Sequence, residues 1–347
     1  MKKLSKLTFA FMVAFAIVGH VAGVFAWQES TEKKAEKGGE AASEDVSAIP
    51  STTSDPNAVD LLDQAKTRLF ERRSVQADVV QTVSLGEYRV RSSGKYVSAT
   101  GFRHRLQYQL SLGDLTGEFL EVCDGQILHT RRQITPVNNK FDAVAQPETE
   151  MTRRDIQRIR REALGIKDGN PTADLSDALR AAEAGLGGLP AILAMIERTM
   201  ILEPVRTQTV GDRDYFVLQG RMRPDRQKEL LTGLGSAGGQ QVAGFLPDLV
   251  RVYLEQETLF PEKFVYLKKV SGKKEEGAAR PLVPLITIEY DNVILDQPLQ
   301  ESQFIYMAPP GLEERDETAM YIEMMRQAAN AVLTQPEAEG AGKEKAE

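Results

Sequence analysis

The sequence has little sulfur and little basic charge. It contains a single cysteine, Cys123, among 347 residues. No internal disulfide can therefore form, and stability has to come from a packed core. The 50 acidic residues outnumber the 43 basic ones and give a formal net charge of -7. A protein that binds nucleic-acid phosphates needs a concentrated basic surface instead, so we expect no nucleic-acid partner.

Acidic residues are absent before Glu29, and this end of the chain has the pattern of an export signal. Three lysines form a positive n-region, Leu7 to Phe25 form an apolar run, and Ala26 is a small residue at the cleavage position. Cleavage after residue 26 would remove three lysines and no acid, and would change the formal charge from -7 to -10. The run is also close to the ~20 residues that span a bilayer, so an uncleaved inner-membrane anchor stays open. Both alternatives predict a periplasmic or otherwise extracytoplasmic domain.

Composition divides the rest of the chain into three parts. Residues 27–55 are rich in charged and small polar residues without an apolar period, which predicts a disordered linker. Residues 56–313 carry the main domain, with a helical insertion at about 147–203. Residues 314–347 hold a C-terminal helix at about 318–333 and a charged tail that we expect to be disordered.

The stretch from Gly101 to Leu112 shows the clearest period of two. Apolar and polar residues alternate along it, which is typical of a strand with one dry and one wet face. Short turn signals divide residues 74–132 into about five strands, which must form an antiparallel meander. Further strands are predicted at 205–222, 249–256, 263–270, 283–291 and 304–307.

Helical periods precede and interrupt these strands. Asp55 and Pro56 begin a first helix, Thr152 and Asp155 form a capping-box pattern, and a third helix starts at Leu189 and continues to about residue 202. Together these elements predict an α+β fold: a curved antiparallel sheet with one wet and one dry face, and helices that must cover the dry, concave face. The helices either seal that face into an ordinary core or leave a cavity beneath them. A transmembrane barrel also alternates, but it has no room for helices in mid-chain.

Other motifs support no specific chemistry. Gly233, Gly235 and Gly238 spell GxGxxG, but a helical pattern precedes them where a nucleotide site needs a strand. Cys123 and His129 flank one tight turn without a third catalytic group, and with His104 they make a poor zinc site. Five arginines between 153 and 161 could meet anionic lipids, but neighbouring acids favour a balanced surface. We therefore expect no catalytic residue, no metal, no cofactor and no enzyme activity.

Several segments resemble the periplasmic outer-membrane lipoprotein carrier family, with its LolA/LolB-like fold. They are VDLLDQAKTRL, SVQADVVQTVS, RSSGKYVSATGFRHRLQYQL, LEVCDGQILHTRR, TLFPEKFVYLKKVSG and LITIEYDNVILDQPLQESQFIYMAPPGLE. The resemblance implies a curved antiparallel unclosed β-barrel, or half-barrel, with helices covering the concave face. It also implies an apolar cavity for the acyl chains of a lipoprotein. Its wall would be Phe102, Leu106, Tyr108, Leu110, Val250, Val252, Leu254, Ile286, Ile288 and Tyr290. Its lid would be Ile192, Met195, Ile196 and Met200. The segment 133–248 is longer than such a carrier needs.

Two functions follow from these expectations. The first is an extracytoplasmic carrier of lipid or lipoprotein acyl chains, a monomer that exchanges its cargo with inner- and outer-membrane transfer partners. The alternative is an envelope sensor or interaction module of the same fold that binds lipid or peptide and stays tethered to the membrane. An unassigned hydrolase comes third.

Overall fold

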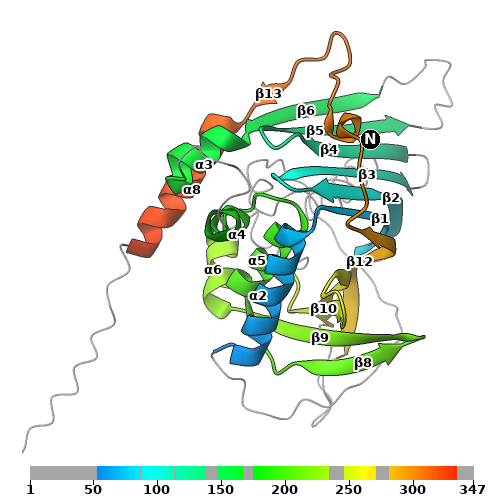
Figure 1. Ribbon diagram of the computed structural model, residues 1–347, viewed down its shortest axis with the longest axis vertical. Helices are drawn as coiled ribbons and strands as arrows, with labels where there is room; N and C mark the ends of the chain where they lie inside the picture. The colour runs from blue at the N-terminus through cyan, green and yellow to red at the C-terminus, as the bar shows by residue number, and fades with distance from the viewer. Residues whose placement is uncertain are drawn as a thin grey trace, which may run out of the picture.

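The computed structural model describes residues 53–85, 88–112, 115–136, 147–166, 175–233, 246–270 and 281–333. The predicted export signal, nearly all of the predicted linker, and the tail after residue 333 lie outside these ranges. The described strands form one sheet of 13 strands, with six helices packed around it (Figure 1). The two ends of the strand order do not pair with each other, so the sheet is an unclosed half-barrel, as the family resemblance implied.

The first half of the chain forms one side of this sheet. Asp55 caps helix α2 by accepting a hydrogen bond from the Ala58 N–H at 3.0 Å. The elements in order are α2 (Pro56–Glu71), β1 (Ser74–Leu85), β2 (Tyr88–Ala99), β3 (Arg103–Leu112), β4 (Leu115–Cys123), β5 (Ile127–Pro136) and β6 (Glu148–Asp155). Each strand from β1 to β6 pairs antiparallel with the next, so the predicted meander is confirmed.

The second half begins with helices and returns to the sheet from the opposite edge. Its helices and first strands are α3 (Ile156–Leu164), α4 (Leu175–Glu183), α5 (Leu189–Thr199), β7 (Met200–Leu202), β8 (Arg206–Val210), β9 (Arg213–Met222) and α6 (Pro224–Gly233). The remaining elements are β10 (Leu249–Glu255), β11 (Pro261–Lys269), β12 (Leu282–Leu295), the 3₁₀ turn η2 (Glu301–Phe304), β13 (Arg315–Asp316) and α8 (Thr318–Leu333).

The strand order explains how the helices cover the sheet. It runs β13-β6-β5-β4-β3-β2-β1-β12-β11-β10-β9-β7, with β8 paired to β9. The chain leaves the sheet after β6, near one edge, and re-enters at β7 on the other edge. The helices α3, α4 and α5 make this crossing, and α2 lies beside them (Figure 1). The crossing segment therefore spans the sheet, which is why it is long.

Strands β2 and β3 approach each other closely at Gly94. A Cβ atom at this position would lie 1.7 Å from the backbone oxygen of Gln107, so only glycine fits. Gly94 pairs with Val79 on one side and with Tyr108 on the other. This close approach therefore lies in the middle of the sheet, in the same row as Tyr108.

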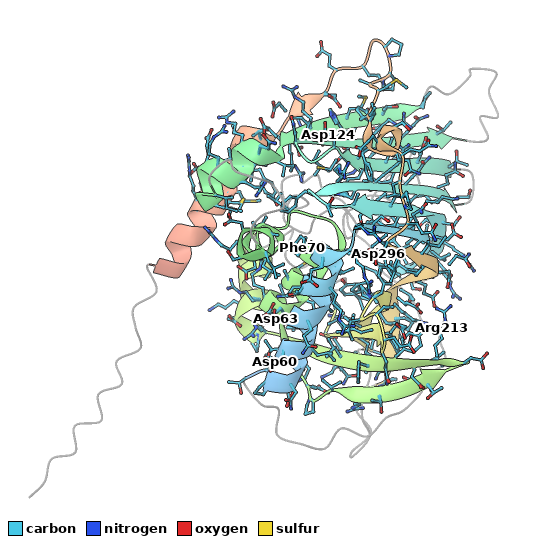
Figure 2. The ribbon with its side chains drawn as sticks, viewed as in Figure 1. Asp60, Asp63, Phe70, Asp124, Arg213 and Asp296 are labelled. Carbon is cyan, nitrogen blue, oxygen red and sulfur yellow. The ribbon has the colours of Figure 1, made fainter. Side chains whose placement is uncertain are left out.

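The buried apolar residues form two clusters. The main cluster lies between the concave face and the helices α2 and α5, and it includes residues of β1, β2, β3 and β9 to β12. The edge cluster lies beside β4 to β6, under α3, α4 and α8. It consists of Phe102, Cys123, Leu128, Ile156, Ile159, Ala181, Leu186, Tyr321 and Ile322. Phe70 at the end of α2 contacts Phe102 edge-on, with ring centroids 6.1 Å apart, where the two regions meet (Figure 2).

Three local predictions were wrong. Residues 148–155 form strand β6, because Asp155 itself is the helix cap and accepts from the Arg158 N–H at 2.7 Å. The third helix ends at Thr199, because the buried residues Met200 to Leu202 pair with β9 as β7. The predicted strand at 304–307 is replaced by the turn η2, whose Phe304 is buried.

Candidate ligand-binding interior

The predicted wall residues are buried on the concave face. All ten have exposed fractions of 8% or less, and Val250, Val252 and Leu254 have none. Nine of the ten belong to the main cluster. Phe102 belongs to the edge cluster instead, because it precedes β3 with a φ of 63° and lies under the Arg160 guanidinium, 4.7 Å from its ring centroid.

The predicted lid corresponds to α5 and the first residue of β7. Ile196 and Met200 are buried, whereas Ile192 and Met195 are half-buried. Leu189, Leu193 and Ile196 join the main cluster from α5. Helix α5 therefore lies over the concave face, as predicted for the helices of this fold, and its apolar side chains fill the space beneath it. We call α5 the cover.

An ion pair joins this cover to α2. The Lys66 ammonium contacts the Glu197 carboxylate of α5 and lies 2.6 Å from the Asp63 carboxylate of its own helix. Burial lowers the pKa of Lys66, but its hydrogen bonds to Asp63 and Glu197 outweigh that effect and raise it above the ordinary value. The lysine is therefore charged at neutral pH, and it fixes one side of α5. Sequence reasoning missed Lys66 because a lysine on a helix is normally solvated.

Glycines connect the other end of α5 to the edge cluster. Gly185, Gly187 and Gly188 have positive φ values of 83°, 103° and 68°. A Cβ on Gly188 would also lie 2.8 Å from the Tyr96 hydroxyl. The chain therefore changes direction here through residues that only glycine accommodates, immediately before the cover begins.

Four buried tyrosines gather on the concave face: Tyr96, Tyr108, Tyr266 and Tyr290. The rings of Tyr96 and Tyr290 meet edge-on with centroids 5.9 Å apart. Burial raises the pKa of Tyr290 well above its ordinary value, and the neighbouring Tyr108, Tyr96 and Tyr266 raise it further. Only Tyr108 and Tyr290 stood among the predicted wall residues. Tyr96 and Tyr266 were missed because Gly94 and a register shift between Tyr266 and Leu267 interrupt the alternation there.

A buried histidine and glutamate lie between the two clusters. His104 Nδ1 is 3.1 Å from the Phe102 carbonyl oxygen, and Nε2 is 3.1 Å from a Glu121 carboxyl oxygen. A carbonyl oxygen only accepts, so Nδ1 carries a proton. The pair thus satisfies its own hydrogen bonds within the protein, and it provides no free nucleophile or metal-binding group.

The paired registers separate Cys123 from His129. Cys123 pairs with Leu128 and points into the edge cluster, whereas His129 pairs with Val122 and lies on the other face. There His129 stacks on Tyr306 at 4.5 Å and contacts Glu314 at 2.8 Å. Burial raises the pKa of the Cys123 thiol to about 12, so the reactive thiolate is suppressed. These two residues do not form a catalytic pair.

Three of the arginines between 153 and 161 form ion pairs with other residues of this protein. Arg153 pairs with Asp316 at 3.0 Å, Arg154 with Glu317 at 2.8 Å and Arg158 with Glu162 at 2.7 Å. These contacts support the balanced surface favoured from the sequence over a lipid-headgroup site. Gly233 ends helix α6, and the other two glycines of the GxGxxG pattern lie outside the described residues.

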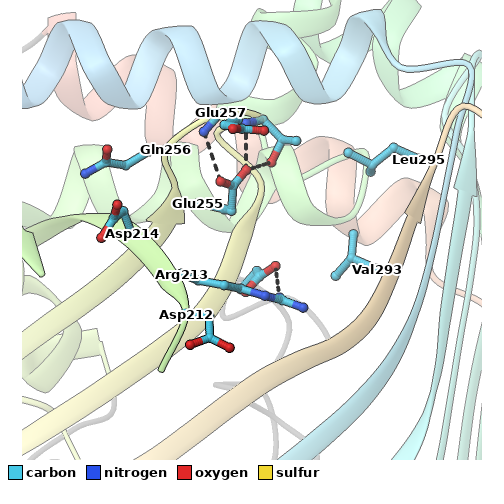
Figure 3. Close-up of a pocket in the computed structure, with 10 residues that line it drawn as sticks. Asp212, Arg213, Asp214, Glu255, Gln256, Glu257, Val293 and Leu295 are labelled. Carbon is cyan, nitrogen blue, oxygen red and sulfur yellow. Dashed lines mark hydrogen bonds and ion pairs between the residues drawn. The ribbon is translucent and has the colours of Figure 1, made fainter. Parts of the chain in front are cut away.

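Two hollows open on the described surface, and both are polar. The larger, of about 450 Å³, is lined by Asp212, Arg213, Asp214, Glu255, Gln256, Glu257, Thr258, Glu262, Val293 and Leu295. Figure 3 shows the Arg213 side chain lying across it, and Arg213 pairs with Glu262 at 2.7 Å. The smaller hollow, of about 270 Å³, contains Leu110 but no other predicted wall residue.

Comparison with known proteins finds likenesses among solved structures. No family model matches the chain, and no curated protein matches its sequence. A structure of MucB matches 73% of this chain and 64% of its own chain, at 14% identity and a TM-score of 0.35. The complex of Pseudomonas aeruginosa MucA and MucB matches 74% of this chain and 68% of its own, at 14% identity and a TM-score of 0.34.

A third solved structure belongs to the class of protein that the sequence resembles. It is a Vibrio parahaemolyticus domain assigned to outer membrane lipoprotein sorting, with 10% identity, a TM-score of 0.24, and coverage of 72% of this chain and 97% of its own. This chain spans less than two thirds of the MucB chain that it matches.

Within the described ranges, no helix is both long enough and apolar enough to cross a bilayer.

Proposed function

We propose that this protein is an extracytoplasmic module that binds the acyl chains of a lipid or lipoprotein between its concave face and helix α5. The observation that carries this proposal is the continuity of the main cluster. One apolar surface extends from Leu110 on β3 through β1 and β12 to Val250 on β10, and the helices α2 and α5 cover it.

The cover is built so that it can be exchanged for a ligand. Leu189, Leu193 and Ile196 bury their side chains against the concave face, and an acyl chain offers the same kind of apolar surface. Replacing helix side chains by methylene groups preserves most of the buried apolar area, which is the main stabilising term. The glycines before α5 provide a hinge, and the contact between Lys66 and Glu197 closes the cover.

Two glutamate substitutions on one strand test the proposal. Ile288 of β12 has 2% exposure on the concave face, whereas the neighbouring Thr287 points to the other face. We expect the unmodified protein to bind an environment-sensitive fluorescent acyl probe. Thr287→Glu should keep this binding, and Ile288→Glu should abolish it while circular dichroism confirms that both variants are folded.

The results of probe binding distinguish a ligand-binding interior from an ordinary packed core. No probe binding by the unmodified protein contradicts the proposal. Equal probe binding by folded Ile288→Glu also contradicts it, because a charge on the wall must exclude an apolar chain from that site.

A second candidate is the sensor or interaction module, and the segment after η2 favours it. This segment crosses the convex face, since Glu301 binds Arg103 at 2.6 Å and Tyr306 stacks on His129. Ile305 and Met307 point away from the sheet with exposed fractions of 59% and 84%. Native mass spectrometry of the protein recovered from its own envelope distinguishes the candidates. A bound acylated molecule supports the carrier, and a stoichiometric protein partner with an uncleaved residue 1 supports the module.

A further inference from the structure

One polar atom in the main cluster has no hydrogen bond within the protein. The Tyr108 side chain is 1% exposed, and its hydroxyl is buried without a partner. Other described side chains also bury an unpaired polar atom, but of these only Tyr108 lies in the main cluster. Burying a hydroxyl without a partner opposes folding, whereas phenylalanine would fill the same space without that penalty.

Packing alone does not explain why residue 108 is a tyrosine. Its ring lies beside Phe119, with centroids 6.4 Å apart, and it pairs across the sheet with Gly94, which has no side chain. The next strands in the same row contribute Val79 and Tyr290. These neighbours pack against the ring, and none of them forms a hydrogen bond with its hydroxyl.

A nearby tyrosine with a satisfied hydroxyl provides the contrast. The Tyr96 hydroxyl accepts a hydrogen bond from the Leu189 N–H at 3.4 Å, at the first residue of α5. Tyr96 thus binds the first residue of α5, while Tyr108, in the neighbouring row of the sheet, stays unpaired. Both side chains belong to the main cluster.

The charges around Tyr108 restrict what it could bind. Burial raises the pKa of Tyr108, and the Glu121 carboxylate raises it further, so this hydroxyl keeps its proton and donates it. An anionic group would also lose its hydration among the apolar side chains of the main cluster. A neutral acceptor such as a carbonyl oxygen fits this environment, and a free carboxylate does not.

We propose that the Tyr108 hydroxyl donates a hydrogen bond to the carbonyl oxygen of an ester or amide that links an acyl chain to the ligand. The interior therefore selects O- or N-acylated molecules over ethers, hydrocarbons and free fatty acids. This inference rests on the proposed function and names the ligand chemistry of the same interior.

Two neutral probes isolate the carbonyl group. Methyl hexadecanoate and hexadecyl methyl ether have the same number of carbons and differ by one carbonyl in place of a methylene group. Each competes with the fluorescent acyl probe for the full-length protein. We expect the unmodified protein to prefer the ester about three- to tenfold, the worth of one hydrogen bond in a protein interior. Hexadecanoate at neutral pH should bind more weakly than the ester.

The variant Tyr108→Phe should remove this preference and bind both probes with similar affinity. Because it removes an unpaired hydroxyl, it should not lower the melting temperature of the ligand-free protein. Tyr253→Phe is the matched control, because Tyr253 is only half-buried and points away from Val252 and Leu254 to the other face of β10. The control should keep the ester preference.

The outcomes are distinct for the two proposals. If the unmodified protein binds neither probe, the proposed function fails and this inference fails with it. If it binds both probes but Tyr108→Phe keeps the full ester preference, the proposed function stands and this inference is overturned. A marked loss of melting temperature in Tyr108→Phe also overturns it, since the hydroxyl would then stabilise the empty protein.

Discussion

The main cluster and the edge cluster bury similar side chains but treat their polar groups differently. In the edge cluster, Tyr321 donates to the Ala184 carbonyl at 2.9 Å, and the Arg154 guanidinium lies 5.0 Å from the Tyr321 ring centroid. Arg154 also binds Glu317 at 2.8 Å. In the main cluster, the Tyr108 hydroxyl remains unpaired. The edge cluster has the features of a fixed support, and the main cluster has those of a site that a ligand completes.

The position of α5 allows this helix to move while part of the edge cluster stays fixed. Its first residues follow the glycines that leave the edge cluster, and its last residue joins β7 directly. Helix α4 is joined to α5, because Arg198 donates a hydrogen bond to the Glu183 carbonyl at 2.7 Å. Helices α3 and α8 can remain packed while α5 moves.

Truncation of one core residue in each cluster should produce the largest effect. Leu193 of α5 and Ile159 of α3 both have 0% exposure. Replacing either by alanine should lower the free energy of unfolding by about 2–5 kcal/mol, as measured by urea denaturation. Only Leu193→Ala should also tighten binding of the acyl probe, because it enlarges the space beneath the cover. Equal effects of both variants on probe binding would contradict the division between the clusters.

Acid should weaken the edge cluster before the main cluster. Hydrogen bonds and charges from Arg315 and Arg154 outweigh burial and hold the pKa of Glu317 below its ordinary value. A carboxyl group with a lowered pKa in the folded state stabilises the protein above its unfolded pKa, and this stability is lost as the pH falls through the folded value. We expect amide exchange of α8 to rise first on acidification, as measured by mass spectrometry.

The variant Glu317→Gln controls this pH effect. It should remove the acid-dependent part of the change in α8 and leave exchange in the strands of the main cluster unaltered. Simultaneous opening of both clusters in the unmodified protein would show that they form one cooperative unit.

Loosening the cover should have the smallest effect on stability. Glu197→Gln removes the charge that Lys66 contacts from α5, while Asp63 remains 2.6 Å from the ammonium. We expect a loss of about 1 kcal/mol in unfolding free energy and faster entry of the acyl probe in stopped-flow fluorescence. Glu183→Gln on α4 makes the same charge change at an exposed position and should alter neither quantity. If the acyl probe enters Glu197→Gln at the same rate as the unmodified protein, the ion pair has no role in closing the cover.

Much of the fold was predictable because alternation and turns are local signals. The strands β1 to β5 and the helix from Thr318 to Leu333 follow directly from them. Strand β6 was missed because its sequence, ETEMTRRD, is mostly charged, and pairing with β5 decides its structure. Alternation identified the dry face through residues such as Leu106 and Ile288. The family resemblance, and not alternation, implied a lid at Ile192, Met195, Ile196 and Met200. Alternation alone could not identify it, because the packing of α5 depends on contacts across the whole sheet.

Hydrogen exchange of α5 with and without saturating methyl hexadecanoate tests the central claim most directly. If the ligand replaces the cover, amides of 189–199 should exchange faster, amides of β10 and β12 should exchange more slowly, and α3 and α8 should remain unchanged. Unchanged or slower exchange in α5, measured while the ligand is bound, would contradict the account.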